Sequence, residues 1–211
     1  MDNDGVFKLI AIERRRAADM FEGLSDAQLS ERSLCAEWTV RDIAGHMISP
    51  FRVSTARFLL SAALSGGFNR YSAKLARTLG QEPVDRLIAT LRENADHRFT
   101  PPGNGPEAPL SDISIHTRDV ARPLGLKVSA PLATWQVVLD FLMSPKAVRG
   151  FLPKGATDAL RFAATDQDWS AGTGPEVSGP SEALALAIAG RKVALEDLSG
   201  EGLSELRSRL R

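Results

Sequence analysis

Apolar residues recur every three or four positions along the first two thirds of the chain, the spacing typical of helices with one buried face. Between Val6 and Leu24 this stripe lies opposite a charged run at residues 13–16. Similar stripes predict further helices over 39–64, 84–97, 112–122 and 133–143. A short helical turn is expected after Ser25. Together these segments fit a bundle built around four principal helices with loops between them.

The second of these helices has the clearest boundaries. Thr39, with Asp42 three residues later, forms an N-terminal capping pattern in front of an apolar run. Pro50 lacks a backbone N–H, so we expect a kink or break about one turn after His46, with the helix resuming through Leu64.

Loops separate the later helices. Residues 99–109 contain four prolines and two glycines, a composition typical of a surface loop. Ser111 is a suitable cap for a helix from Asp112 to about Arg122. Another helix is expected from Ala133 to Met143.

The pattern changes after Gly150. Residues 159–165 and 169–172 are typical of two strands, Val177 is a possible start for a third, and residues 180–188 and 203–210 are expected to be helical. We therefore predict a helical domain over residues 1–149 and a small α/β domain over residues 150–211.

Composition and charge narrow the classes of partner. The chain has 26 basic and 26 acidic side chains, and this balance argues against nucleic acid or an anionic membrane surface as a partner. The single cysteine, Cys35, cannot form an intramolecular disulfide and is expected to be a small packing residue beside Trp38. With no signal-peptide pattern and no long apolar stretch, a soluble cytoplasmic protein is expected.

Two of the three histidines fall inside predicted helices. Asp112 and His116 are four residues apart, so their Cβ atoms lie about 5 to 6 Å from each other on one helix face, which Asp119 shares. His46 lies at the edge of the apolar stripe of its own helix. Two imidazoles and one carboxylate suit Zn²⁺, iron or nickel and leave room for water or substrate.

These spacings also have simpler interpretations. An aspartate and a histidine four residues apart are common as a surface hydrogen-bonded pair, and a histidine beside an apolar stripe is common as a core residue. His97, near a predicted helix end, is suited to capping exposed carbonyls. Phosphate-binding glycine loops, serine-hydrolase elbows and Cys-x-x-Cys pairs are absent from the sequence, so the metal hypothesis has few rivals.

Three separated motifs carry a resemblance to a known family. They are Leu34–Asp42 leading into His46, the stretch Asp112–Gly125, and the tail residues from Ala164 to Arg191. In this order they resemble the mycothiol-dependent maleylpyruvate isomerase family, which belongs to the DinB-like four-helix metalloproteins. The resemblance implies an α-helical up-and-down four-helix bundle followed by the small α/β domain.

The resemblance also implies a chemistry. His46, Asp112 and His116 would bind a divalent metal, most simply Zn²⁺, although the family usually has glutamate where Asp112 stands, and aspartate reaches about 1.5 Å less far. Asp119 and Arg122 would orient the ligand helix, and Arg191 would act in catalysis by contacting a substrate or cofactor carboxylate. Mycothiol would be the thiol cosubstrate.

Three functions remain open at this point. The chain could be a metal-dependent, mycothiol-using transferase or isomerase acting on a small electrophile, as a monomer or homodimer. The alternative is a non-catalytic protein of the same fold that binds a metal or a small ligand. In the third case, Asp112 and His116 are polar residues of a scaffold that binds another protein.

Overall fold

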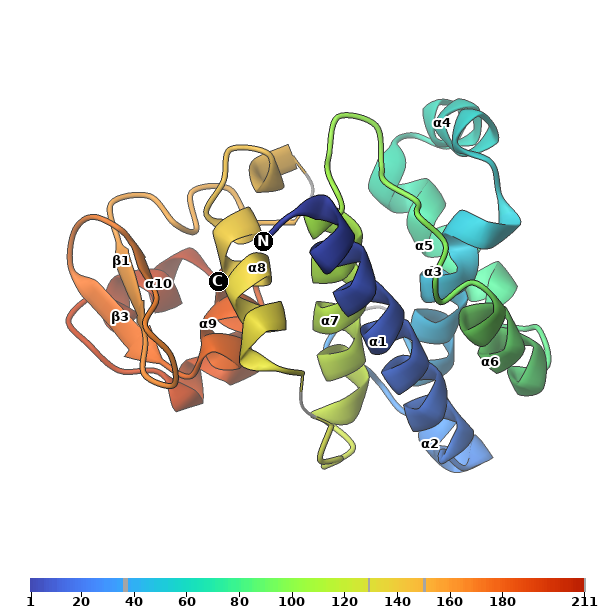
Figure 1. Cartoon of the computed structure of the whole chain (residues 1–211), viewed down its shortest axis with the longest axis horizontal. Coiled ribbons are helices and arrows are strands. Elements are labelled where there is room, and N and C mark those ends of the chain that lie inside the picture. The colour runs from blue at the N-terminus through green and yellow to red at the C-terminus, as the bar shows by residue number, and fades with distance from the viewer. Residues whose placement is uncertain (36–37, 129, 150, 211) are drawn as a thin grey trace. The chain divides into compact units, whose positions relative to one another are not determined.

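The structure, a computed structural model, describes residues 1–35, 38–128, 130–149 and 151–210 (Figure 1). Two compact units divide the chain, Asp2–Ser129 and Ala130–Arg211. Within the described ranges, none of the helices combines the length and apolar character needed to cross a bilayer.

The first unit is mainly helical, as the sequence predicts. Its centre is a closed ring of four helices in which α1 and α3 each pack against both α6 and α7. Seven helices make up the described part of this unit: α1 (Asn3–Glu22), α2 (Asp26–Ser30), α3 (Val40–Arg52), α4 (Thr55–Leu64), α5 (Phe68–Leu79), α6 (Val84–Glu93) and α7 (Glu107–Ala121).

Helix α3 begins as its capping pattern predicts. The Thr39 hydroxyl accepts a hydrogen bond from the Asp42 amide, and the Asp42 carboxylate accepts one from the Thr39 amide. Pro50 lies in the last turn, and the helix ends at Arg52, two residues beyond it. The chain resumes as α4, so the predicted interruption is confirmed.

Helix α5 was not predicted, because its buried face is built partly from small residues, Ser72 and Ala76, instead of a continuous stripe of large ones. It packs closely against α3 at Gly45. A Cβ atom at Gly45 would lie 2.3 Å from the Ala76 carbonyl oxygen and 2.5 Å from the Gly80 nitrogen. The two helix backbones therefore touch one residue before His46, which fixes the position of that side chain.

Helix α7 begins at Glu107, five residues earlier than predicted. Pro109 is tolerated in its first turn because amides there have no partner within the helix. Ser111, predicted to cap the helix, is instead buried inside it, and its hydroxyl donates to the Glu107 carbonyl. Asp112 and His116 remain one turn apart on this longer helix.

The second unit contains the small mixed sheet that the tail predicts. Strand β1 (Arg161–Ala164) lies between β2 (Ser170–Gly172), which is antiparallel to it, and β3 (Glu176–Gly179), which is parallel. Phe162 pairs with Val177, and both are fully buried. The helices of this unit are α8 (Leu132–Leu142), η1 (Ala147–Arg149), α9 (Ser181–Ile188), η2 (Lys192–Asp197) and α10 (Leu203–Arg209).

Helix α8 corrects one expectation. We predicted it as the last helix of the bundle, but it belongs to the second unit and packs against α9. The Trp169 indole, which follows the first strand, donates a 2.8 Å hydrogen bond to the Asp140 carboxylate on α8. The compact units thus divide near residue 130, whereas the boundary predicted at Gly150 lies at a residue outside the described ranges and stays a prediction.

Candidate metal centre

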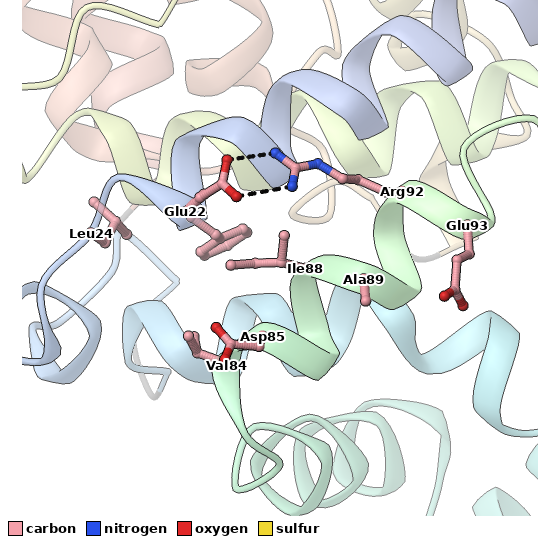
Figure 2. Close-up of a pocket in the computed structure, with 9 residues that line it drawn as sticks. Glu22, Leu24, Val84, Asp85, Ile88, Ala89, Arg92 and Glu93 are labelled. Atoms are coloured by element: carbon pink, nitrogen blue, oxygen red, sulfur yellow. Dashed lines mark hydrogen bonds and ion pairs between the residues drawn. The ribbon is translucent and has the colours of Figure 1, made fainter.

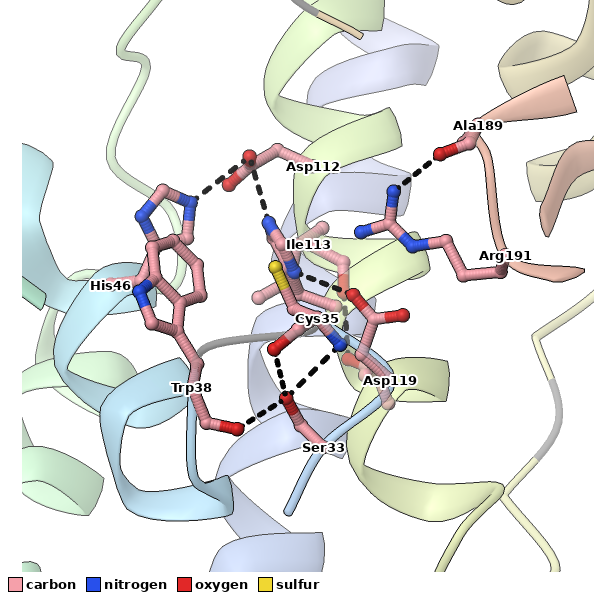
Figure 3. Close-up of polar contacts among 11 residues, drawn as sticks. Ser33, Cys35, Trp38, His46, Asp112, Ile113, Asp119, Ala189 and Arg191 are labelled. Atoms are coloured by element: carbon pink, nitrogen blue, oxygen red, sulfur yellow. Dashed lines mark hydrogen bonds and ion pairs between the residues drawn. The ribbon is translucent and has the colours of Figure 1, made fainter. Parts of the chain in front are cut away.

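Side chains from two helices of the first unit meet at one point. His46 lies in the second turn of α3, and Asp112 and His116 lie one turn apart on α7. One donor atom from each of the three residues lies within 4.8 Å of the other two. Figure 3 shows His46 and Asp112 facing each other across this point. The structure therefore brings together the three residues that the sequence singles out.

The distances fit a shared cation. His46 Nε2 lies 3.2 Å from Asp112 Oδ1, and His116 Nε2 lies 3.7 Å from the same oxygen. Two ligands of a tetrahedral Zn²⁺ with bonds of about 2.0 to 2.1 Å are separated by roughly 3.4 Å. The Asp112 side chain is 36% exposed, whereas those of His46 and His116 are 16% and 11% exposed, so the group is open on the aspartate side.

Asp119 fixes the proton of His116. Its fully buried carboxylate accepts a 2.8 Å hydrogen bond from His116 Nδ1. In a neutral His116 ring, a proton on Nδ1 leaves Nε2 as an acceptor that faces the Asp112 carboxylate, so two acceptors face each other. A cation between them removes this repulsion. Such a histidine–carboxylate pair is the usual support of a metal-binding imidazole.

The His46 ring is held by ring packing, whereas the His116 ring is held by its hydrogen bond to Asp119. Its Nδ1 is buried and has no hydrogen-bond partner within the parts of the chain that the structure describes. Its ring instead packs on Trp38, with centroids 4.8 Å apart, and Trp38 also lies 5.7 Å from the His116 ring. Trp38 therefore packs against both imidazoles. In the sequence, the feature that indicates a role for Trp38 near His46 is its position immediately before Thr39, the N-cap of the same helix.

Cys35 belongs to a second possible group. Its sulfur lies within 4.8 Å of donor atoms of His116 and Asp119. However, His116 and Asp119 are joined by a 2.8 Å hydrogen bond, which is shorter than the roughly 3.4 Å between two ligands of one ion. The group of His46, Asp112 and His116 is therefore the better metal site, with the half-buried Cys35 beside it.

A buried arginine on α1, Arg14, contributes a positive charge that interacts with Asp112. Arg14 is 4% exposed, and its Nη1 donates to the carbonyls of Asn94, Ala95 and His97. Burial lowers the pKa of Arg14 to about 10, an effect that the negative charges of Asp112 and Asp96 oppose. The guanidinium thus stays charged at neutral pH and offsets part of the negative charge of Asp112.

Three further candidate residues are placed within their own units. His97 is exposed, and its ring packs against Phe51 with centroids 5.5 Å apart. Arg122 is the C-cap residue of α7, one turn beyond Asp119. Arg191 is in the second unit, where it donates to the Ala189 carbonyl at 2.7 Å. The roles expected for Arg122 and Arg191 stay predictions.

An open hollow of about 480 Å³ lies between the end of α1 and α6, apart from the two histidines (Figure 2). Its wall includes Phe21, Ile88 and an ion pair between Glu22 and Arg92. The hydrogen bonds of this pair lower the pKa of Glu22 and raise that of Arg92. No histidine or cysteine lines the hollow, so it offers no comparable chemistry.

The fold and site define a mainly helical protein with a small mixed sheet and a candidate metal-binding group of two histidines and one aspartate. The sequence matches the mycothiol maleylpyruvate isomerase N-terminal domain family over residues 10–135. Because this match covers more than half of the chain, the chain belongs to that family.

Solved structures support the fold assignment. The chain is similar to a mycothiol-dependent maleylpyruvate isomerase (15% identity) and to a histidine-to-alanine mutant described under the same name (14% identity). Each comparison has a TM-score of 0.55 and covers 95% of this chain and 93% of the other. Identities this low show the fold alone. Among curated proteins, none matches the sequence significantly.

Proposed function

We propose that the chain binds one divalent metal, most simply Zn²⁺, through His46 Nε2, an oxygen of Asp112 and His116 Nε2. The convergence of both Nε2 atoms on a single carboxylate oxygen, at 3.2 and 3.7 Å, is the observation that carries this proposal. The hydrogen bond from His116 to buried Asp119 supports it, because it leaves Nε2 available as a ligand. The direct packing of α3 against α7 supports a role for the shorter aspartate, which lacks the extra methylene of glutamate.

We further propose that the protein is a thiol-dependent transferase or isomerase for a small electrophile, with mycothiol as the thiol. A bound metal would stabilise the thiolate that attacks the electrophile. His46, Asp112 and His116 would use three coordination positions and leave others open on the exposed side of Asp112. Trp38 would keep both imidazoles in place and shield them from water on the buried side. Family membership supports this choice of thiol.

Turnover is the direct test of this activity. Zn²⁺-loaded protein is incubated with mycothiol and a panel of small electrophiles, including maleylpyruvate, and loss of thiol or isomerisation of substrate is measured. We expect turnover that needs mycothiol, is not supported by an unrelated thiol at the same concentration, and is lost in Asp112→Ala. Metal binding without any mycothiol-dependent turnover would instead favour the non-catalytic, ligand-binding alternative.

The role of Asp119 gives a separate prediction. Asp119→Asn keeps the size of the side chain but removes the charge that holds the Nδ1 proton of His116. We expect Zn²⁺ affinity to fall about 10- to 100-fold, as is usual when the partner of a metal-binding histidine is lost. The measurement is competition with a fluorescent chelator. Asp96→Asn, which changes an exposed carboxylate of the same unit, is the control and should leave the affinity unchanged. Equal affinities in the two variants would contradict the role given to Asp119.

A further inference from the structure

The helical hairpin formed by α4 and α5 exposes an unusual number of large apolar side chains. Leu59, Leu60, Leu64 and Phe68 are 52%, 63%, 81% and 61% exposed, and we call them the apolar ridge. In α4, only Ala62 is buried, and the main packing partner of the helix is α5. Figure 1 shows α4 at the outer edge of its unit, beyond α5.

The three leucines of the ridge lie on one continuous face of α4. At 100° per residue, Leu59, Leu60, Leu64 and the two exposed alanines of α4 cover an arc of about 140° that faces away from α5. Phe58 lies on the other side of α4 and contacts Phe68 and Tyr71, with ring centroids 5.1 Å apart in both pairs. The hairpin therefore has its own small core and presents a second apolar face outward.

The same hairpin is strongly basic. Between residues 55 and 79 the sequence has four arginines and lysines and not one acidic residue, although the whole chain is neutral. Arg57, Arg70 and Lys74 are exposed, and we call them the basic group. Within the described ranges, none of the three is in an ion pair. Arg70 lies against the turn between the helices, since its Nη1 is 3.5 Å from the Cβ position at Gly66.

We propose that this hairpin docks on the surface of an anionic phospholipid bilayer. An apolar helix face flanked by unpaired cations is the arrangement of helices that lie in the membrane interface, with leucine and phenylalanine among the acyl chains and cations near the headgroups. The inference departs from the expectation drawn from net charge, because the relevant quantity is the local charge of the hairpin. It does not depend on the proposed metal chemistry.

The positive charge of the basic group also argues against a second copy of this chain as the partner that covers the apolar ridge. A two-fold symmetric dimer through the apolar ridge would place the basic group of one chain near that of its partner. Like charges at an interface are unfavourable, whereas an anionic lipid surface complements them. Docking needs no helix that spans the bilayer.

Vesicle binding tests the proposal with the full chain. Flotation is measured with vesicles of phosphatidylcholine alone and of phosphatidylcholine mixed with an equal amount of phosphatidylglycerol. We expect binding to the mixed vesicles only, and its loss at about 1 M salt, where the screening length falls to about 3 Å. Arg70→Gln/Lys74→Gln should lower the partition coefficient about 30-fold, which corresponds to about 1 kcal/mol for each cation near the surface.

Matched variants test whether binding depends on the apolar ridge and the basic group and not on surface charge in general. Leu60→Glu/Leu64→Glu should abolish binding, while Arg86→Gln/Lys127→Gln, which changes two exposed cations outside the hairpin by the same net charge, should have no effect. Circular dichroism checks the fold of each variant. Lack of binding to the mixed vesicles, equal binding to neutral vesicles, or an equal loss in the control variant would overturn the proposal. A dimer of the wild-type chain that is detected by light scattering and dissociates in Leu60→Glu/Leu64→Glu would also overturn the proposal, because a second copy would then cover the apolar ridge.

Discussion

Replacing His116 with alanine is expected to lower the affinity for Zn²⁺ on the order of 1000-fold. Zinc sites built from side chains bind with roughly 10 to 16 kcal/mol, so one ligand accounts for about 4 kcal/mol. The variant also leaves the buried carboxylate of Asp119 without its 2.8 Å partner. Elemental analysis of protein purified without chelator should give about one metal per chain for the wild type and almost none for His116→Ala.

His97→Ala is the matched control for this prediction. It removes the third imidazole of the chain, which is exposed and packs on Phe51 instead of facing Asp112. Its metal content should equal that of the wild type. His46→Ala should behave like His116→Ala, since both Nε2 atoms face the same oxygen. Full metal occupancy in either of those two variants would exclude the proposed ligand set.

Replacing Arg14 with methionine is expected to reduce the free energy of unfolding by about 3 kcal/mol. The guanidinium donates to three carbonyls just after α6, at 3.0, 3.1 and 2.6 Å, and these three hydrogen bonds are lost when it is removed. Methionine keeps an apolar side chain against Phe51, on which the guanidinium packs at 5.0 Å. Urea denaturation followed by circular dichroism measures the loss.

Arg15→Met provides the comparison. Arg15 is the next residue on α1, and its exposed guanidinium pairs with Asp96, so its replacement should cost about 0 to 1 kcal/mol. The pH dependence gives a further check. Burial lowers the pKa of Arg14 to about 10 from 12.5, so its charge changes only above that pH, and stability rises only there as the proton is lost. The difference between wild type and Arg14→Met should therefore be constant from about pH 6 to 8. An equal loss in the two variants would contradict the structural role of Arg14.

Local rules were sufficient where a feature depends on neighbours in the sequence. The reciprocal hydrogen bonds of Thr39 and Asp42, the end of α3 just after Pro50 and the three strands of the tail follow from spacing and turn chemistry. The same holds for the placement of Asp112, His116 and Asp119 on one face of α7, because residues three and four apart share a face.

Predictions failed where packing partners decide the outcome. The periodicity of α8 gives its buried face but not its partner, which within the second unit is α9. Helix α7 starts earlier than its pattern predicts, because Pro109 favours a loop in the sequence but is accepted in the first turn of a helix. The zero net charge concealed the basic hairpin, since a sum over the chain carries no information about its distribution.

The sequence by itself determined which side chains are available for a metal and on which helices they lie. Only the tertiary structure brought His46 on α3 to within 3.2 Å of Asp112 on α7, 66 residues later, and placed Trp38 against both imidazoles. The physical reason is that helix periodicity depends on residues a few positions apart, whereas the approach of α3 to α7 results from the packing of the whole bundle. Close contacts such as that between α3 and α5 at Gly45 are part of this packing, and they become visible only in the folded chain.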